Sequence, residues 1–228
     1  KPNTKALFLT HASNVTGTIL PVAEAAAIAR DNGLVLCVDA AQTAGALPID
    51  VKEMDVDFLV FTGHKSLFGP QGTGGLYIRP GFEDQLRPLM LGGTGSRSEH
   101  ETQPDFMPDK FESGTINTVG LAGLEAGVGF VLDKGVSAIR ACEEDLTAQL
   151  LEGLTALDGV RVYGPTTAHE RTAVVSFTLP NLSPSDAALI LDEEFGILCR
   201  PGLHCAPSAH RTIGTFPAGT IRFSLGVF

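Results

Sequence analysis

The sequence predicts an α/β fold, and three observations support this prediction. Short apolar runs recur between helix-like segments along the first third of the chain. These runs are continuously apolar rather than alternating, which is typical of strands in a parallel sheet that helices cover on both faces. The 228 residues are 43% hydrophobic and 18% charged, so the chain has enough apolar content for a core and a length that suits one or two domains.

The first part of the chain alternates strands with a helix. Residues 6–10 are predicted to form a buried strand, and Pro21 then opens a helix that runs to about Arg30, with Gly33 just beyond its end. Further strands are predicted at 34–38, 58–61 and 75–78, the last of them antiparallel or crossing. Residues 82–114 are rich in Gly, Pro and charge, and we expect a loop with short helices there.

The second part of the chain begins with two long helices. Small residues in the first of them, residues 117–132, permit close packing, and the second, residues 136–157, is amphipathic. Strands are predicted at 160–162, 173–178 and 220–224, with a helix at 185–195. We place the domain boundary between the two long helices, which gives units of residues 1–134 and 135–228.

Charge and cysteine content exclude several classes of protein. The net charge of −10 argues against nucleic acid as a partner, since phosphate contacts need clustered Lys and Arg. No apolar run is long enough to cross a bilayer, so no membrane partner is expected. The four cysteines form no CxxC pair, which favours reduced thiols and a cytoplasmic protein, and Cys37 is expected in the core because it lies within a predicted strand.

Polar residues follow three of the predicted strands. Residues 11–17 follow the first strand, Asp39 and Gln42 follow the second, and Thr62, His64 and Lys65 follow the third. In open α/β sheets, ligands bind beyond the carboxyl ends of the strands. A partly desolvated lysine there would have a lowered pKa and could form a Schiff base, while a neighbouring carboxylate could hold a protonated ring nitrogen. A site for pyridoxal phosphate needs this combination of groups.

Simpler interpretations of each loop remain open. A His-Lys pair in a loop is often a solvated turn, and residues 69–72 could be only a tight turn. Asp39 after an apolar strand also resembles the acidic end of a nucleotide-binding strand, but no GxxxxGK[ST] loop accompanies it. The combination of three such loops in order is much harder to obtain by chance.

Five stretches carry a resemblance to a known family: THASNVTGTILP, VDAAQTAGALPIDV, DFLVFTGHKSLFGPQGTGGLYI, FESGTINTVGLAGL and CRPGLHCAPSAHRTIGT. In these stretches the chain resembles the class V aminotransferase family, and within it the cysteine desulfurases of the NifS/SufS-like kind. The resemblance implies a fold-type I transferase dependent on pyridoxal 5'-phosphate. Residues 1–134 would then be the later part of the large, mainly parallel cofactor domain. Residues 135–228 would be a small α+β C-terminal domain that lacks its last part.

The resemblance assigns a role to each residue of the three loops. Lys65 would carry the cofactor covalently, and Asp39 would pair with its pyridine nitrogen. The remaining implied contacts are Gln42 to the phenolic oxygen, Thr62 and His64 to the phosphate, Asn14 to the ring and the substrate, and Thr115 to the phosphate in a neighbouring subunit. The role of Thr115 implies a homodimer.

The resemblance also makes Cys205 a nucleophile. L-cysteine would be converted to L-alanine, with the sulfur left as a persulfide on Cys205, and a sulfur-acceptor protein is a further partner that the resemblance admits. Arg222 resembles the family arginine that holds the substrate carboxylate, and Arg200 resembles a second arginine near the mouth of the site. The alternative is a metal site formed by Cys205, His204 and His210, but their spacing fits no common zinc pattern, and no metal is expected.

Two classes of function therefore remain. The first is an enzyme: a cysteine desulfurase, a selenocysteine lyase or another lyase of the class V fold. The second is a binding or structural fragment without turnover. The family has an opening segment that precedes the first strand found here, so we expect the chain to be a fragment.

Overall fold

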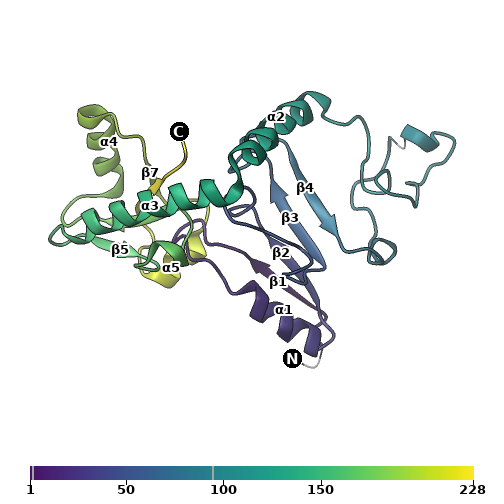
Figure 1. Cartoon of the computed structure of the whole chain (residues 1–228), viewed down its shortest axis with the longest axis horizontal. Coiled ribbons are helices and arrows are strands. Elements are labelled where there is room, and N and C mark those ends of the chain that lie inside the picture. Colours follow the sequence, from purple (N-terminus) through teal and green to yellow (C-terminus); the bar gives the residue numbers. More distant parts are fainter. Residues whose placement is uncertain (2, 94) are drawn as a thin grey trace.

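Two four-stranded sheets organise the structure, a computed structural model that describes residue 1, residues 3–93 and residues 95–228. In Figure 1 the first sheet lies on the right, and the second lies on the left, next to the long helix α3 (Val136–Thr155). The elements of the first sheet are β1 (Ala6–Thr10), α1 (Val22–Asp31), β2 (Val35–Asp39), β3 (Phe58–Thr62) and β4 (Gly74–Ile78).

The first sheet is mostly parallel. Its strands are ordered β1-β2-β3-β4; β1, β2 and β3 are parallel, and β4 is antiparallel to β3. Thr10 pairs with Asp39, and Asp39 pairs with Val60. This register brings the carboxyl ends of three strands to one edge, which confirms the predicted α/β arrangement.

Within the described residues, a helix covers only one face of this sheet. Helix α1 packs its buried residues against Leu36, Val38 and Leu59, and it is the only described helix that contributes to this core. On the opposite face Phe8 is 77% exposed and Leu76 is 47% exposed. The prediction that helices cover both faces is therefore wrong for the described part of the chain, and Cys37 is half-buried rather than in the core.

The second sheet is antiparallel, with the order β5-β6-β8-β7. Two helices cover it, with Leu151, Leu154 and Ala187 packed in one core with Val175, Phe177 and Ile221. This agrees with the expected small α+β unit. Its elements are α3 (Val136–Thr155), β5 (Arg161–Tyr163), β6 (Val174–Thr178), α4 (Pro184–Phe195), β7 (Arg200–Gly202), α5 (Pro207–Ile213) and β8 (Thr220–Ser224).

Helix α2 (Thr118–Lys134) packs closely against the loop that follows β3. A Cβ at Gly123 would lie 2.7 Å from Pro70, and one at Gly127 would lie 2.8 Å from the carbonyl carbon of Phe68. Small residues thus allow the close packing that the sequence predicts. The remaining elements are the short 3-10 helices η1 (Glu83–Gln85), η2 (Gly95–Arg97) and η3 (Ala168–Glu170).

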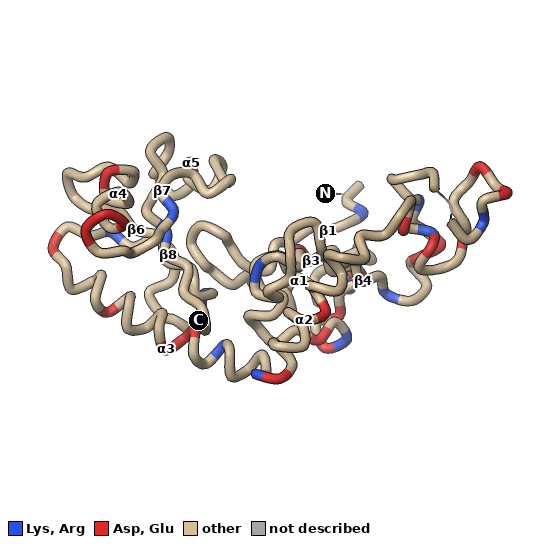
Figure 2. Tube along the Cα trace, turned by 90° about the horizontal axis from the view of Figure 1, so that it is seen from above, with Lys and Arg blue, Asp and Glu red and all other residues tan. Residues whose placement is uncertain are grey.

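Helices α2 and α3 meet at Gly135, which has φ of 81°. The predicted domain boundary falls at this residue, and the division into two domains there stays a prediction. In Figure 2 the elements of the two sheets form two groups, with α3 running along one side. Within the described residues, no helix combines the length and the apolar composition that a membrane span requires.

Candidate active site

One cavity of about 480 Å³ lies between the loops of the first sheet and the strands of the second. Because β1, β2 and β3 are parallel, the loops that follow them reach the same rim. Predicted residues from both halves of the chain line the cavity: Asn14, Gln42, His64, Lys65, Arg200, Cys205 and Arg222.

Lys65 stands in a turn just beyond the end of β3. The Phe68 amide donates to the Lys65 carbonyl at 2.9 Å, and the Gly69 amide donates to the Gly63 carbonyl at 2.8 Å. Burial lowers the pKa of the Lys65 amine, and the positive charge of Arg222 lowers it further, while Asp39 and Cys205 act in the opposite direction. A larger fraction of the amine is therefore neutral, as a nucleophilic or proton-accepting lysine requires.

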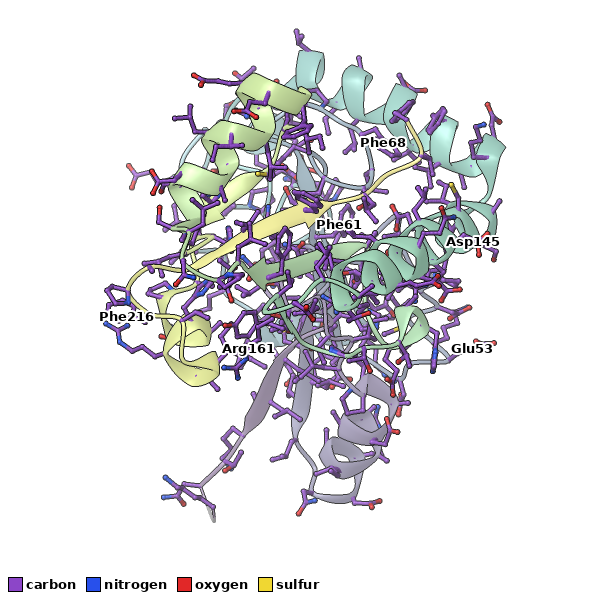
Figure 3. All side chains as sticks on the ribbon, turned by 90° about the vertical axis from the view of Figure 1, so that its left-hand side faces the viewer. Glu53, Phe61, Phe68, Asp145, Arg161 and Phe216 are labelled. Carbon is purple, nitrogen blue, oxygen red and sulfur yellow. The ribbon has the colours of Figure 1, made fainter. Side chains whose placement is uncertain are left out.

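Aromatic packing fixes the far end of the Lys65 turn. Phe68 has a left-handed backbone with φ of 55°, which a bulky residue adopts only when its surroundings impose it. Its ring centroid lies 5.4 Å from that of Phe130 on α2 and 5.1 Å from that of Phe228. In Figure 3, Phe68 lies close to α2 and the C-terminal segment. The turn that carries Lys65 is therefore held from both halves of the chain.

The other polar groups of the first sheet lie at neighbouring strand ends. Asp39 is the last residue of β2, and its Oδ1 accepts a hydrogen bond from the Ala41 amide at 2.9 Å. The Thr62 hydroxyl and His64 Nδ1 are 2.7 Å apart. Asp39 and Thr62 do not line the cavity wall, although the charge of Asp39 is close enough to affect the pKa of Lys65.

This set of groups fits pyridoxal phosphate. The amine of Lys65 suits the aldehyde, the carboxylate of Asp39 suits the pyridinium, and the paired Thr62 and His64 suit the phosphate. The Gln42 side chain lines the cavity and has no hydrogen-bond partner within the described residues, so its amide remains available to a ligand. No cluster of His, Cys, Asp or Glu that could hold a metal ion occurs in the part of the chain that the structure describes.

Asn14 and Arg222 form a link between the two halves of the site. The Arg222 Nη1 group donates to the Asn14 carbonyl at 3.0 Å, and Asn14 Nδ2 donates to the His204 carbonyl at 2.7 Å. Burial, followed by the nearby charge of Arg200, lowers the pKa of Arg222, while Cys205 raises it. The Arg222 Nε atom is buried and has no partner among the described residues, so the guanidinium retains donors for an anion.

Cys205 is exposed at the cavity and faces a guanidinium. The Arg200 Nη2 group lies 3.4 Å from the Cys205 sulfur. This places Arg200 beside the thiol, whereas the family resemblance implies only a place near the mouth of the site.

Thr115 does not join the cavity within this chain. It is exposed in the segment between β4 and α2, and it is absent from the cavity wall. Figure 1 shows that this segment extends away from both sheets. A role for Thr115 in another subunit stays a prediction.

The structure adds a buried carboxyl group that the sequence does not single out. Glu143 on α3 is 6% exposed, lines the cavity and has no hydrogen-bond partner for its side chain among the residues described. Burial raises its pKa to about 7, against the opposing charge of Arg140. No signal in the sequence could have identified it, because a glutamate on an amphipathic helix usually faces solvent.

The chain is similar to known proteins of one family. The family model for class-V aminotransferases matches residues 1–228. The chain is 38% identical over 225 residues to a protein of Methanothermobacter thermautotrophicus named "Probable cysteine desulfurase", covering 97% of this chain and 56% of that protein. A protein of Pyrococcus abyssi with the same name is 37% identical over 230 residues, covering 98% of this chain and 55% of that protein.

Solved structures give the same result. The apo structure of a cysteine desulfurase from Thermococcus onnurineus NA1 matches with a TM-score of 0.91 and 40% identity, over 98% of this chain and 55% of that one. The cysteine desulfurase CsdA from Escherichia coli matches with a TM-score of 0.87 and 31% identity, over 99% of this chain and 55% of that one. The chain thus spans about half the length of the relatives that it matches.

Proposed function

Because the chain belongs to the class-V aminotransferase family, we propose that the whole protein is a cysteine desulfurase dependent on pyridoxal 5'-phosphate. It converts L-cysteine to L-alanine and leaves the sulfur as a persulfide on Cys205. The observation that carries the proposal is the meeting of Lys65, Arg222 and Cys205 at one cavity, where Arg222 and Cys205 both affect the pKa of the lysine.

Residues at the rim of the first sheet would hold the cofactor. Lys65 would attach it covalently, Asp39 would pair with its ring nitrogen, and Gln42 would bond its phenolic oxygen, while Thr62 and His64 would bind the phosphate. The bound cofactor supplies an electron sink, which lowers the barrier for breaking bonds at the carbon atoms of an amino acid.

Arg222 binds the carboxylate of L-cysteine, with Asn14 beside it. A guanidinium pairs with a carboxylate through two parallel hydrogen bonds, and its partly buried position strengthens them. The contact between Arg222 Nη1 and the Asn14 carbonyl fixes the orientation of the guanidinium before substrate binds.

Lys65 moves protons during the reaction. Its lowered pKa leaves part of the amine neutral, so that it can accept the proton from the α-carbon of the substrate. The same nitrogen can later return a proton to carbon as alanine forms.

Cys205 takes the sulfur. Its thiolate attacks the sulfur of the substrate, a sulfur–sulfur bond forms, and the carbon–sulfur bond breaks. The electron pair of the broken bond stays with the carbon, which takes up a proton and leaves as alanine. Arg200, 3.4 Å from the Cys205 sulfur, offers a cation to the attacking thiolate.

The test measures alanine and protein-bound persulfide after the whole protein is mixed with L-cysteine. Cys205→Ser is expected to bind L-cysteine but to accumulate no persulfide, because it lacks the attacking sulfur. Cys142→Ser, which removes another exposed thiol, is the matched control and should retain turnover. Normal turnover by Cys205→Ser would refute the assignment of the nucleophile.

A second copy of the chain completes the site in this proposal. Thr115 would bind the cofactor phosphate of the partner subunit, which requires a homodimer. Apolar side chains that precede and follow Thr115 in the sequence are exposed, which supports this arrangement. Leu89 is 93% exposed and Val119 is 85% exposed. Mixing Lys65→Ala with Thr115→Ala subunits tests it, since half of the sites in mixed dimers would regain both residues.

The persulfide then passes to an acceptor protein. The exposure of Cys205 at the surface supports this step, because a buried persulfide would be inaccessible to another protein. All four cysteines are free, which supports a cytoplasmic location where thiols remain reduced.

A further inference from the structure

Cys205 lies in a strained turn. His204 has φ of 51° and Cys205 has φ of 63°, and the Ala206 amide donates to the Leu203 carbonyl at 2.8 Å. Positive φ at both central residues is characteristic of a type I′ turn, which glycine and asparagine normally supply. Each non-glycine residue in the left-handed region costs roughly 1–2 kcal/mol, so surrounding contacts must impose this conformation.

Those contacts converge on His204, whose side chain is almost completely buried. The residue is 3% exposed, and its ring Nε2 lies 3.0 Å from the hydroxyl of Thr220, which is fully buried in β8. Its carbonyl accepts the hydrogen bond from Asn14 Nδ2 at 2.7 Å. The turn is therefore held on one side by the second sheet and on the other by the loop that follows β1.

The same contacts connect the turn to the substrate-binding arginine. Asn14 also accepts a hydrogen bond from Arg222, and Arg222 follows Thr220 by two residues on β8. One strand thus holds both Arg222 and, through Thr220, the residue that precedes Cys205. The separation between the carboxylate-binding group and the attacking sulfur is set by these bonds.

His204 acts as a neutral group. Burial lowers its pKa to about 4, and the charges of Arg222, His210 and Arg200 contribute in the same direction, while a hydrogen bond with the Thr220 backbone acts in the opposite direction. Behind it, His210 is also fully buried, with the two ring centroids 5.3 Å apart, and His210 Nδ1 lies 2.7 Å from the Thr215 hydroxyl. A ring that stays neutral and enclosed is suited to hold the turn rather than to carry a proton.

We propose that His204 is a positioning residue for sulfur transfer: bonded to Thr220 and Asn14, it fixes the strained turn that aims the Cys205 sulfur at the substrate. This rests on the proposed desulfurase function and adds to it a residue of the cavity wall that acts through Cys205. Removing the hydroxyl of Thr220 breaks its hydrogen bond with the His204 ring and changes the side-chain volume least.

The experiment uses the whole protein with Thr220→Val, Thr220→Ser and Thr147→Val. Valine keeps the volume of threonine and removes the hydroxyl, and serine restores the hydroxyl. Thr147 on α3 is 1% exposed and bonded to the Glu143 carbonyl, so Thr147→Val makes the same change at equal burial. Three quantities are measured for each variant: kcat and KM for alanine formation, the rate of Cys205 alkylation by iodoacetamide, and the thermal midpoint.

Misplacement of a reacting group by about 1 Å can cost on the order of 10²-fold in rate. Thr220→Val is therefore expected to lower kcat about 10- to 100-fold with KM nearly unchanged, and to alter the alkylation rate of Cys205. Thr220→Ser should recover most of kcat, and Thr147→Val should resemble the unmodified protein in kcat and alkylation rate. Equal kcat in Thr220→Val and Thr147→Val would overturn the proposal.

A second variant keeps the proposal testable if Thr220→Val fails to fold. Asparagine tolerates the left-handed conformation, but it is too short to replace the ring of His204. His204→Asn should therefore fold and show the same loss of kcat, and an unchanged kcat would count against the proposal. If the unmodified protein forms no alanine, the desulfurase function fails, while the alkylation rates of Thr220→Val and Thr220→Ser still decide whether the turn positions Cys205.

Discussion

Gly45 allows two loops of the site to touch, and replacing it with alanine should separate them. Gly45 follows β2 with φ of 90°, and a Cβ there would lie 2.7 Å from the carbonyl carbon of Ser66 and closer still to its oxygen. Ser66 is the neighbour of Lys65 in the chain. A methyl group at position 45 therefore pushes directly on the backbone that carries the lysine.

Two effects set the size of the loss in stability. The left-handed backbone costs a non-glycine residue roughly 1–2 kcal/mol, and overpacking against a fixed backbone costs roughly 1–3 kcal/mol. The two effects together should lower the free energy of unfolding of Gly45→Ala by roughly 2–5 kcal/mol. This corresponds to a fall in Tm of roughly 4–20 °C for a chain of this size. A shift of Lys65 by about 1 Å would in addition lower the rate on the order of 10²-fold.

Gly33→Ala provides the matched control. Gly33 also has a left-handed backbone, with φ of 61°, but no atom lies within 4 Å of its Cβ position. The free energy of unfolding of Gly33→Ala should therefore fall only by the roughly 1–2 kcal/mol of backbone strain, and the variant should keep its turnover. Thermal unfolding, cofactor attachment and alanine formation are measured for both variants. The reasoning is refuted if Gly45→Ala is no less stable than Gly33→Ala and attaches cofactor normally.

Three further predictions concern charged groups of the site. Lys65→Ala should abolish the cofactor linkage that borohydride reduces, and a variant that kept this linkage would exclude Lys65 as the attachment point. Arg222→Ala should raise KM for L-cysteine roughly 10- to 100-fold, since hydrogen bonds to a charged group are worth roughly 1.5–3 kcal/mol, and an unchanged KM would mean that another group holds the carboxylate. The pKa of Glu143 is raised from 4.5 to about 7 in the folded chain, so its contribution to stability is present below pH 4.5 and is lost as the pH rises through 7. Glu143→Gln should remove this loss, on the order of 3 kcal/mol above pH 7, and urea unfolding at pH 5 and pH 8 measures the difference.

Much of the first sheet could be predicted from local patterns. The apolar run at Ala6–Thr10 coincides with β1, and polar residues follow β2 and β3 where the parallel strands end. Because the side chains after parallel strands meet at one edge, the order of the loops was sufficient to bring Gln42, His64 and Lys65 together.

Other elements carry too weak a local signal. Strand β7 contains Pro201 and Gly202, residues that normally mark edges or turns, and its place in the sheet depends on pairing with β8. Helix α5 has only seven residues. The open face of the first sheet was also unpredictable, since continuously apolar strands indicate that both faces are covered.

The contacts that complete the site were beyond the reach of sequence reasoning for a different reason. The hydrogen bond from Asn14 to the His204 carbonyl joins residues 190 positions apart, and the bond from Arg222 to Asn14 joins residues 208 positions apart. Neither leaves a periodic or compositional trace. The left-handed turn at His204 and Cys205 even contradicts local preference, as expected where surrounding contacts and function determine the backbone.

The two halves of the site are held by different kinds of contact. A substitution can therefore disturb one half and leave the other in place. Asp39 and Lys65 are placed by strand register and by close approach of glycines, which involve no atom of the Cys205 turn. Cys205 is placed by side-chain bonds through His204 and Thr220, which involve no atom of the Lys65 turn. Substitutions of the first kind, such as Gly45→Ala, should therefore reduce cofactor attachment and turnover together. Substitutions of the second kind should leave the cofactor attached and slow only the transfer of sulfur.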